Sequence, residues 1–358
     1  MSPLDGVRVL DLSRLLPGPA CSWYLYGLGA EVIKIEDPEG GDYLRHVPPF
    51  GPDGIGVWFT ALNAGKRSVA LDLRSAEGKA GLRALLRTAD VLLEGFRPGV
   101  MAKLGFDPAE LVASYPRLVV ASLTGYGQTG PMRDAPGHDL NYVGLAGLLA
   151  LGRRHDGVPD VPAIQAADLA GGALTTALAI AAALVQRERT GRGQWLDLSM
   201  TEGALALALP SLAAAAAGAP PTPGAEALTG GLASYRVYRC ADDRLLTLAA
   251  LEPKFWAALC AAVGRELPAD PAALEALFLT RPRDAWVEAL RDACVAPVLD
   301  IAEVADHPLH VARGAFVGEG ASRRLRPPFP GARVGDRAPA LGQHNEIELG
   351  APGSGASE

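Results

Sequence analysis

The chain of 358 residues is 49% hydrophobic and 20% charged, with a formal net charge of −7. This length favours two domains over a single core, and the excess of acidic residues argues against a nucleic-acid partner. The four cysteines, at positions 21, 240, 260 and 294, form no C-x-x-C motif, which argues against a cysteine metal site and a disulfide framework and favours a reducing cytoplasm.

The first half of the chain predicts alternating strands and helices. The expected elements are a strand over 7–13, a helix over 19–30, a strand over 31–36, a strand over 68–73, a helix over 75–89 and strands over 90–96 and 118–127. This alternation is typical of an α/β domain with a doubly wound parallel sheet. No G-x-G-x-x-G follows the first strand, so a dinucleotide site is not indicated.

Two apolar stretches, 169–185 and 204–220, are rich in alanine. The first is at the short limit for a membrane span and leads into charged residues, and Pro210 interrupts the second. Both are predicted to be helices in close protein contact, so no membrane partner is expected. No basic segment leading into an apolar one opens the chain, so no signal peptide is predicted.

The later part of the chain predicts a smaller domain. After a strand over 194–200 comes a connector rich in Ala, Pro and Gly over 201–229, and a small α+β domain is expected over 230–314. It would contain a β-hairpin that turns at Asp242 and Asp243, followed by three helices. Residues 349–358 are predicted to be a disordered tail.

Three residues are candidates for acid/base chemistry. His138 and Asp168 each stand just before a predicted helix, and Glu252 precedes Pro253 at the end of an apolar run. Ligands of an open parallel sheet bind beyond the carboxyl ends of its strands, where loops lead into helices. Each residue also has an ordinary structural interpretation: Asp is a favoured N-cap, Glu is common in a first helical turn, and a loop His is often a surface residue.

Together these residues suggest proton transfer. A helix N-terminus can stabilise an oxyanion, and it also favours a neutral histidine that can act as a base. Two opposed acid/base groups can remove a proton from one face of a carbon and return it on the other. Basic residues near strand ends favour an anionic ligand, with a solvated surface as the alternative; they are Lys66, Arg67, Arg74, Arg97 and Lys103. No metal-ligand cluster and no Ser- or Cys-centred nucleophile motif competes with this interpretation.

The chain resembles the class III CoA-transferases, the CaiB/BaiF family, which also contains carnitine and bile-acid CoA enzymes and α-methylacyl-CoA racemase. The resemblance runs nearly end to end, through "LDGVRVLDLSRLLPGP", "LGAEVIKIEDPEGGD", "NAGKRSVALDLRSAEGK", "DVLLEGFRPGVMAKLGF", "GYGQTGP", "GHDLNY", "CVAPVL" and "LGQHNE". No single segment is specific for this family, but the occurrence of all of them in this order is.

Within the family, the chain is most similar to the racemases, which have a His in a "GHD-NY" motif, an Asp thirty residues later and a Glu in an "EP-F" motif. Here these are His138, Asp168 and Glu252. The resemblance implies that the first two are the acid/base residues and that Glu252 orients and polarises His138. The transferases instead use the Asp as a nucleophile, generally lack the His–Glu pair and carry a glycine-rich loop in the small domain, which "LTGGLASY" matches poorly.

The same resemblance implies contacts with CoA. They would come from Leu71, Asp72, Leu73, Arg74, Gly95, Phe96, Arg97, Lys103, Gly137, Asp139, Leu140, Asn141 and Tyr142. Racemases can carry an Arg before the Pro of an "IDRP"-like segment, where it meets the nucleotide, whereas this chain has Asp37 before Pro38. Arg67 or Arg45 is expected to supply that charge instead.

The resemblance further implies a large CoA-binding α/β domain over 1–200, completed by 315–348, and an interlocked homodimer. The hypothesis from sequence is a cytoplasmic racemase of 2-methylacyl-CoA thioesters that works through an enolate and needs no cofactor or metal, because CoA is part of the substrate. Two alternatives stay open. One is a CoA transferase that moves CoA between carboxylic acids through an aspartyl-CoA anhydride at Asp168, and the other is an acyl-CoA-binding protein without turnover.

Overall fold

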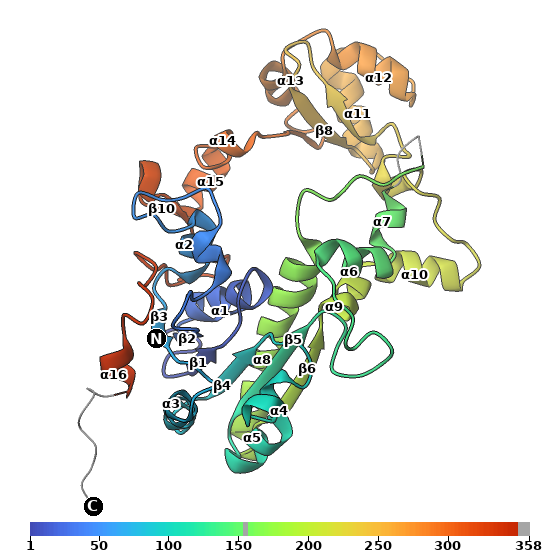
Figure 1. Ribbon diagram of the computed structural model, residues 1–358. Helices are drawn as coiled ribbons and strands as arrows, with labels where there is room; N and C mark the ends of the chain where they lie inside the picture. Colours follow the sequence, from blue (N-terminus) through green and yellow to red (C-terminus); the bar gives the residue numbers. More distant parts are fainter. Residues whose placement is uncertain (153–156, 350–358) are drawn as a thin grey trace, which may run out of the picture. The chain divides into compact units, whose positions relative to one another are not determined.

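The structure is a computed structural model that describes residues 1–152 and 157–349 (Figure 1). The chain divides into two compact units. Unit 1 consists of residues 1–146, 162–207 and 314–358, and unit 2 of residues 147–161 and 208–313. The predicted tail, 349–358, lies outside the described residues except for Leu349.

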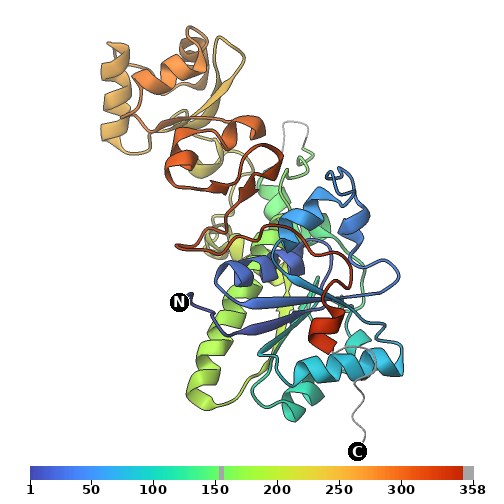
Figure 2. The same cartoon turned by 90° about the vertical axis from the view of Figure 1, so that its left-hand side faces the viewer.

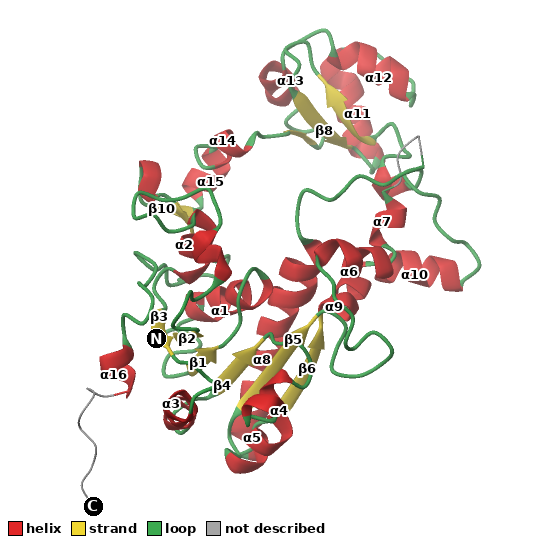
Figure 3. Ribbon diagram, in the orientation of Figure 1, coloured by secondary structure: helices red, strands yellow, loops and turns green. Residues whose placement is uncertain are grey.

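Unit 1 is built on a six-stranded parallel sheet (Figure 3). Its strands are β1 (Arg8–Asp11), β2 (Glu31–Glu36), β3 (Arg67–Ala70), β4 (Val91–Glu94), β5 (Val119–Thr124) and β6 (Trp195–Ser199). They lie in the order β3-β2-β1-β4-β5-β6, and every neighbouring pair is parallel. The order reverses between β1 and β4, and the carboxyl ends at such a switch point are where open α/β sheets bind ligands.

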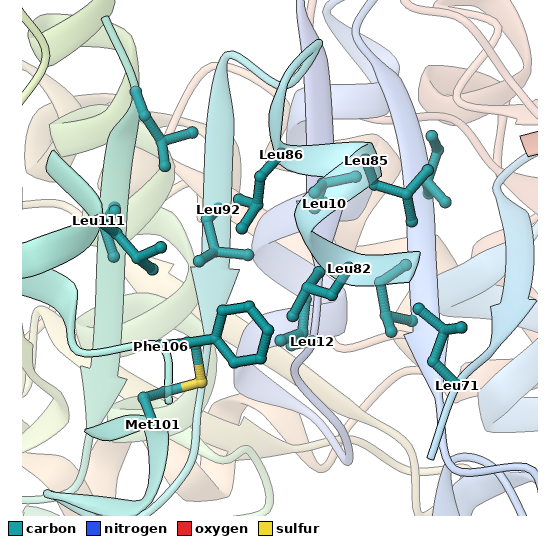
Figure 4. Close-up of a cluster of buried hydrophobic side chains, with 14 of the residues drawn as sticks. Leu10, Leu12, Leu71, Leu82, Leu85, Leu86, Leu92, Met101, Phe106 and Leu111 are labelled. Atoms are coloured by element: carbon teal, nitrogen blue, oxygen red, sulfur yellow. The ribbon is translucent and has the colours of Figure 1, made fainter. Parts of the chain in front are cut away.

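Helices cover both faces of this sheet, as a doubly wound fold requires (Figure 2). On one face lie α3 (Ala76–Leu86), α4 (Val100–Leu104) and α5 (Pro108–Ser114), whose leucines and Met101 form one core with Leu10, Leu92 and other strand residues (Figure 4). On the other face lie α1 (Pro17–Gly27) and the long helix that ends in α8 (Thr175–Thr190). Alternate strand residues point to opposite faces, so Asp11 faces α1 while Leu10 faces α3.

The long helix spans Ala167–Thr190, and by length and composition alone it could cross a membrane. Its first part, Ala167–Leu174, is π-helical and continues directly into α8. In the structure this helix contacts α1, α9 (Met200–Leu207) and β5, all of which belong to unit 1. It therefore packs as a helix of the sheet domain, as its alanines and glycines suggest.

Further helices of unit 1 are α2 (Val57–Asn63), α6 (Asp139–Leu145) and α16 (Asn345–Leu349). Residues near the end of the chain cover the edge strand β3: the Ser68 N–H donates to His344 Nδ1 over 3.1 Å, and the Ala70 N–H donates to Asn345 Oδ1 over 2.9 Å. A short hairpin, β10 (Phe316–Val317) with β11 (Arg324–Leu325), precedes this segment.

Unit 2 contains a three-stranded antiparallel sheet and several helices. The strands are β7 (Tyr235–Arg239), β8 (Leu245–Ala249) and β9 (Val295–Pro297); the helices are α7 (Leu148–Leu151), α10 (Leu209–Ala216), α11 (Pro253–Val263), α12 (Pro271–Phe278), α13 (Arg283–Ala289), α14 (Ile301–Val304) and α15 (Pro308–Ala312). Its core gathers Leu246 and Leu248 with Phe278 and Trp286. The predicted hairpin turns at Asp243, whose φ of 63° is left-handed.

Three details differ from the sequence predictions. The boundary between the two units lies inside the expected connector, because residues up to Leu207 belong to unit 1 and unit 2 includes residues from Ala208 on; the helices α9 and α10 agree with the helical stretch predicted over 204–220. The apolar run after His138 is two helices, because Gly147 adopts a φ of 79° and ends the first one. Asp168 does not precede its helix but lies in the first turn, with Ala166 as the capping residue.

Candidate active site

Two neighbouring cavities open at the carboxyl ends of the unit 1 strands. The first, of about 210 Å³, is lined mainly by residues that follow β1, β2 and β3 and is called the nucleotide-side cavity below. The second, of about 260 Å³, is lined mainly by residues that follow β1, β4 and β5, and also by Asp168; it is called the Asp168 cavity. Ser13, Arg14 and Phe96 line both. The two cavities therefore meet at the switch point between β1 and β4.

The Asp168 cavity brings together two of the three predicted catalytic residues. Both His138 and Asp168 line it, although thirty residues separate them in the chain. The predicted CoA contacts Gly95, Phe96, Arg97, Gly137 and Tyr142 also line this cavity. An imidazole and a carboxylate beside a cavity with arginines in its wall can exchange protons with a bound anionic substrate.

Asp168 has the electrostatics of a proton-transfer group. Burial, followed by repulsion from Asp139, raises the pKa of the Asp168 carboxyl to about 7. The Asp168 N–H donates to Asp139 Oδ1 over 2.9 Å, so the residue next to His138 also fixes the start of the long helix. A carboxyl group with a pKa near neutrality changes protonation state easily at physiological pH.

His138 is held at the beginning of α6. Its backbone is extended, with φ −132° and ψ 174°, and its N–H donates to Asn141 Oδ1 over 3.1 Å. The next turn is fixed by Tyr142, whose hydroxyl donates to the Gly137 carbonyl over 2.6 Å and whose ring meets that of Tyr126 edge-on. Asn141 and Tyr142 thus set the position of an exposed His138.

Four consecutive predicted CoA contacts, Leu71, Asp72, Leu73 and Arg74, line the nucleotide-side cavity. They follow β3, and the Arg74 Nε donates to Asp72 Oδ1 over 2.8 Å. Asp37 lines the same cavity. Racemases can carry an arginine at the position of Asp37, so in this chain that position adds a negative charge to the wall of the nucleotide-side cavity.

The remaining predicted site residues lie elsewhere. Lys103, Asp139, Leu140 and Asn141 line neither cavity, although Asp139 and Asn141 support residues that do. Glu252 is the exposed N-cap of α11 in unit 2, and its side chain makes no capping hydrogen bond. In "LTGGLASY", Gly230 has a φ of 93°, and a Cβ on Gly231 would lie 1.9 Å from the Ala225 carbonyl oxygen, so this turn requires both glycines.

The expectation that Arg45, Arg67 or Lys66 serves an anionic ligand is wrong. The buried Arg45 guanidinium bonds Glu36 over 2.8 and 2.7 Å, and Lys66 is buried against Asp11. Arg67 lies at the amino end of β3, which is the opposite edge of the sheet, and pairs with Glu31 and Glu348. Sequence position alone did not reveal these acidic partners.

Sequence reasoning missed several residues of the cavities. Arg14 and Leu15 follow β1, Tyr126 follows β5, and Arg133 lies on the loop before α6; all four line the Asp168 cavity. Their common signal is that they follow a strand of the parallel sheet. This signal identifies cavity residues only when the order of the strands in the sheet is known, because that order decides which strand ends are neighbours.

Comparison with known proteins identifies the family. Residues 4–345 match the profile of CoA-transferase family III. The chain belongs to this family. It is 35% identical to an alpha-methylacyl-CoA racemase of Mus musculus, over 95% of this chain and 91% of that protein. It is 36% identical to an acetyl-CoA:oxalate CoA-transferase of Acetobacter aceti, over 89% of this chain and 86% of that protein.

The fold agrees with solved structures of the same family. A crystal structure of a CAIB/BAIF family protein from Brucella suis superposes with a TM-score of 0.85 at 30% identity, covering 97% of this chain and 98% of that one. The predicted family is therefore confirmed, and the chain is an enzyme of that family. Racemase and transferase relatives are similar to this family III chain to nearly the same extent.

Proposed function

We propose that this family III protein is a racemase of 2-methylacyl-CoA thioesters. The observation that carries the proposal is the meeting of His138 and Asp168 in one cavity, with the pKa of Asp168 raised to about 7. One group removes the proton from C2 of the acyl chain, and the other returns a proton to the opposite face of the enolate. The electron pair of the broken C–H bond moves onto the thioester oxygen and returns when the new C–H bond forms.

The cavity walls support binding of an acyl-CoA. Arg14, Arg97 and Arg133 supply positive charge for the anionic ligand, and Tyr126 and Met200 offer less polar surface. The proposal needs no separate cofactor, because CoA is part of the substrate. Among residues 1–152 and 157–349, no group of three or more His, Cys, Asp or Glu residues is arranged to hold a metal ion.

The proposal extends to Glu252 and to the assembly. From the resemblance to the racemases, we propose that the Glu252 carboxylate orients the His138 imidazole. We expect the protein to work as an interlocked homodimer in the cytoplasm. Light scattering at several concentrations tests the stoichiometry: a monomer throughout the active range would contradict the dimer.

A transferase is the second candidate, favoured by the similarity to the oxalate CoA-transferase. In that reaction the Asp168 carboxylate attacks the thioester carbonyl and CoA leaves as a thiolate. The ionised form of a carboxyl group with a raised pKa is a stronger base and also a stronger nucleophile, so the pKa of Asp168 fits both reactions. What favours the racemase is His138 in the same cavity, since acyl transfer through Asp168 does not need it.

The test is to incubate each enantiomer of a 2-methylacyl-CoA in D2O and follow deuterium uptake together with configuration at C2. The intact protein should invert both enantiomers and incorporate deuterium. His138→Gln and Asp168→Asn should each stop inversion, and each should still exchange deuterium into one enantiomer, with opposite preferences, because one base remains on each face. New thioester on addition of a free carboxylic acid, without exchange, would establish the transferase; CoA binding with neither reaction would establish a binding protein.

A further inference from the structure

The loop after β1 carries an arginine at the junction of the two cavities. Arg14 lines both of them, and its side chain lies against two aromatic rings. The guanidinium carbon lies 4.8 Å from the centroid of the Tyr43 ring and 5.7 Å from that of Phe96, and Nη1 donates to the Tyr43 hydroxyl over 2.9 Å. These contacts restrain the side chain. No ion pair joins Arg14 to a carboxylate in the part of the chain that the structure describes.

Buried side chains fix the backbone on both sides of Arg14. The Lys34 ammonium donates to the Ser13 carbonyl over 2.8 Å, and the Ser13 N–H donates to Asp11 Oδ1 over 2.9 Å. On the other side, the Leu15 N–H donates to Asp42 Oδ1 over 3.1 Å. Lys34 and Asp42 are in turn an ion pair, 2.9 Å apart, with both side chains at most 1% exposed.

The charge of Lys34 is maintained in spite of this burial. Burial alone disfavours an ammonium group, but attraction by Asp11, Asp42 and Glu36 outweighs it and raises the pKa of Lys34. Lys34 therefore stays charged across the physiological pH range. A buried charged network that bonds the backbone on both sides of Arg14 is a means of keeping this loop rigid.

The backbone of Leu15 shows that the surrounding structure determines the conformation of the loop after β1. Its φ of 64° lies in the left-handed region, which is unfavourable for a branched side chain that lacks a local compensating hydrogen bond. Such residues persist only where the surroundings determine the backbone, and they cluster at binding and catalytic sites. The residue preceding it, Arg14, is therefore held in one position before any ligand arrives.

The charges of the nucleotide-side cavity show what Arg14 is needed for. The basic residues in its wall are Arg14 and Arg74, and Arg74 is paired with Asp72. Asp37 adds a further acidic group, and the other candidates, Arg45 and Arg67, are bound to carboxylates elsewhere. Of the two basic residues that line this cavity, Arg14 is therefore the one for which the structure shows no carboxylate partner among the described residues, and it lies where this cavity meets the Asp168 cavity.

We infer that Arg14 binds the pantetheine-side phosphate of the CoA pyrophosphate where the substrate passes between the two cavities. The Lys34–Asp42 pair and Asp11 are positioning residues for it. This inference rests on the proposed binding of an acyl-CoA, with its nucleotide in one cavity and its thioester in the other. A guanidinium suits this task because its planar set of donors can hold two phosphate oxygens at once.

The test compares three thioesters of one uncharged 2-methylacyl group: those of CoA, of 4′-phosphopantetheine and of pantetheine, which lacks phosphate. Arg14→Ala should raise KM for the first two by about 10- to 100-fold, the usual effect of losing a charge-assisted hydrogen bond, with little change in kcat. For the pantetheine thioester, KM should not change. Arg14→Lys should recover only part of the loss, because it cannot bind two oxygens.

The outcomes separate this inference from the proposed function. If the unmodified protein prefers the CoA thioester over the pantetheine thioester and Arg14→Ala keeps that preference, the role of Arg14 is refuted while CoA binding stands. An equal loss on all three thioesters would also refute it and would indicate that Arg14 contacts the acyl part. If the unmodified protein itself shows no preference for CoA, the proposed function fails, and this assignment with it.

A second pair of variants tests the positioning. Leu15→Gly removes the conformational penalty and loosens the loop, whereas Leu15→Ala removes the same side chain but keeps the loop restricted. Leu15→Gly should raise KM about 2- to 5-fold above that of Leu15→Ala, and only for the two phosphate-bearing thioesters, at an equal or higher Tm. Equal KM values in the two variants would show that loop rigidity contributes nothing to phosphate binding.

Discussion

Replacing Asp168 by Asn should make the protein more stable at pH 8 although it stops inversion at C2 of the substrate. The pKa of Asp168 is raised from 3.8 to about 7 in the folded protein, by burial first and by Asp139 second. Between these two values the unfolded chain has lost the proton and the folded chain still keeps it. The stability of the unmodified protein therefore falls as pH rises from about 4 to about 7. Asn has a similar shape and carries no charge, so it avoids this loss.

The size of the effect follows from the gap between the two pKa values. Each pH unit corresponds to about 1.4 kcal/mol, so a gap of roughly three units sets an upper limit of ~4 kcal/mol. Because water still reaches part of Asp168, we expect about half of that, or ~2 kcal/mol at pH 8. For a domain of this size, that is an increase in Tm of about 4–8 °C.

The assay is thermal unfolding of both proteins at pH values from 4 to 8. The difference in Tm in favour of Asp168→Asn should grow with pH and level off above pH 7. Asp134→Asn is a matched control, because the Asp134 side chain is 78% exposed, and it should leave the pH dependence of Tm unchanged. A difference for Asp168→Asn that stays the same from pH 5 to pH 8 would refute the burial argument for Asp168.

Three further predictions concern activity. In the intact protein, kcat/KM for the enantiomer deprotonated by Asp168 should rise with pH through about 7, because the carboxylate is the reactive form; a profile flat from pH 5 to 8 would contradict this. Glu252→Gln should keep the fold and CoA binding but lower turnover and shift the pH–rate profile, and full activity with an unchanged profile would remove Glu252 from the mechanism. Arg97→Ala should weaken CoA-ester binding mainly through KM, since Arg97 lines the Asp168 cavity; a collapse of kcat at constant KM would assign it another role.

Local patterns predicted the elements of the sheet domain well. The β-rich runs around Val9, Val32 and Val91 became β1, β2 and β4, because each is a short apolar run between turn residues. The short strand β9 was missed, since three residues carry too little pattern to be recognised. The split of the helix after His138 at Gly147 was also missed, because a single glycine in a helical pattern is usually tolerated.

The candidate site was predictable only in part, because charge pairing is a property of the folded chain. Lys66 and Arg45 looked like ligand-binding residues in sequence, and both are buried against acidic partners. Arg14 was not singled out, because its neighbours are distant in the chain: Tyr43 follows β2 and Phe96 follows β4, and both come close to Arg14 only when these strands pair with β1. His138 and Asp168 were candidates because each stands near the start of a predicted helix, and the family resemblance then gave each of them a role.

The strand order also sets the direction in which an acyl-CoA would lie. Leu71 to Arg74 follow β3, Arg14 follows β1, and Tyr126 follows β5, so these residues occur in that sequence across the carboxyl edge of the sheet. In the proposed binding mode, a phosphate of the acyl-CoA lies near Arg14, which follows β1, and the reactive carbon lies beside Asp168. The long helix supplies Asp168 from its first turn, at the β5 end of this edge. Binding and proton transfer therefore use different strand ends of one sheet, and for this reason variants at Arg14 should change KM while variants at Asp168 change kcat.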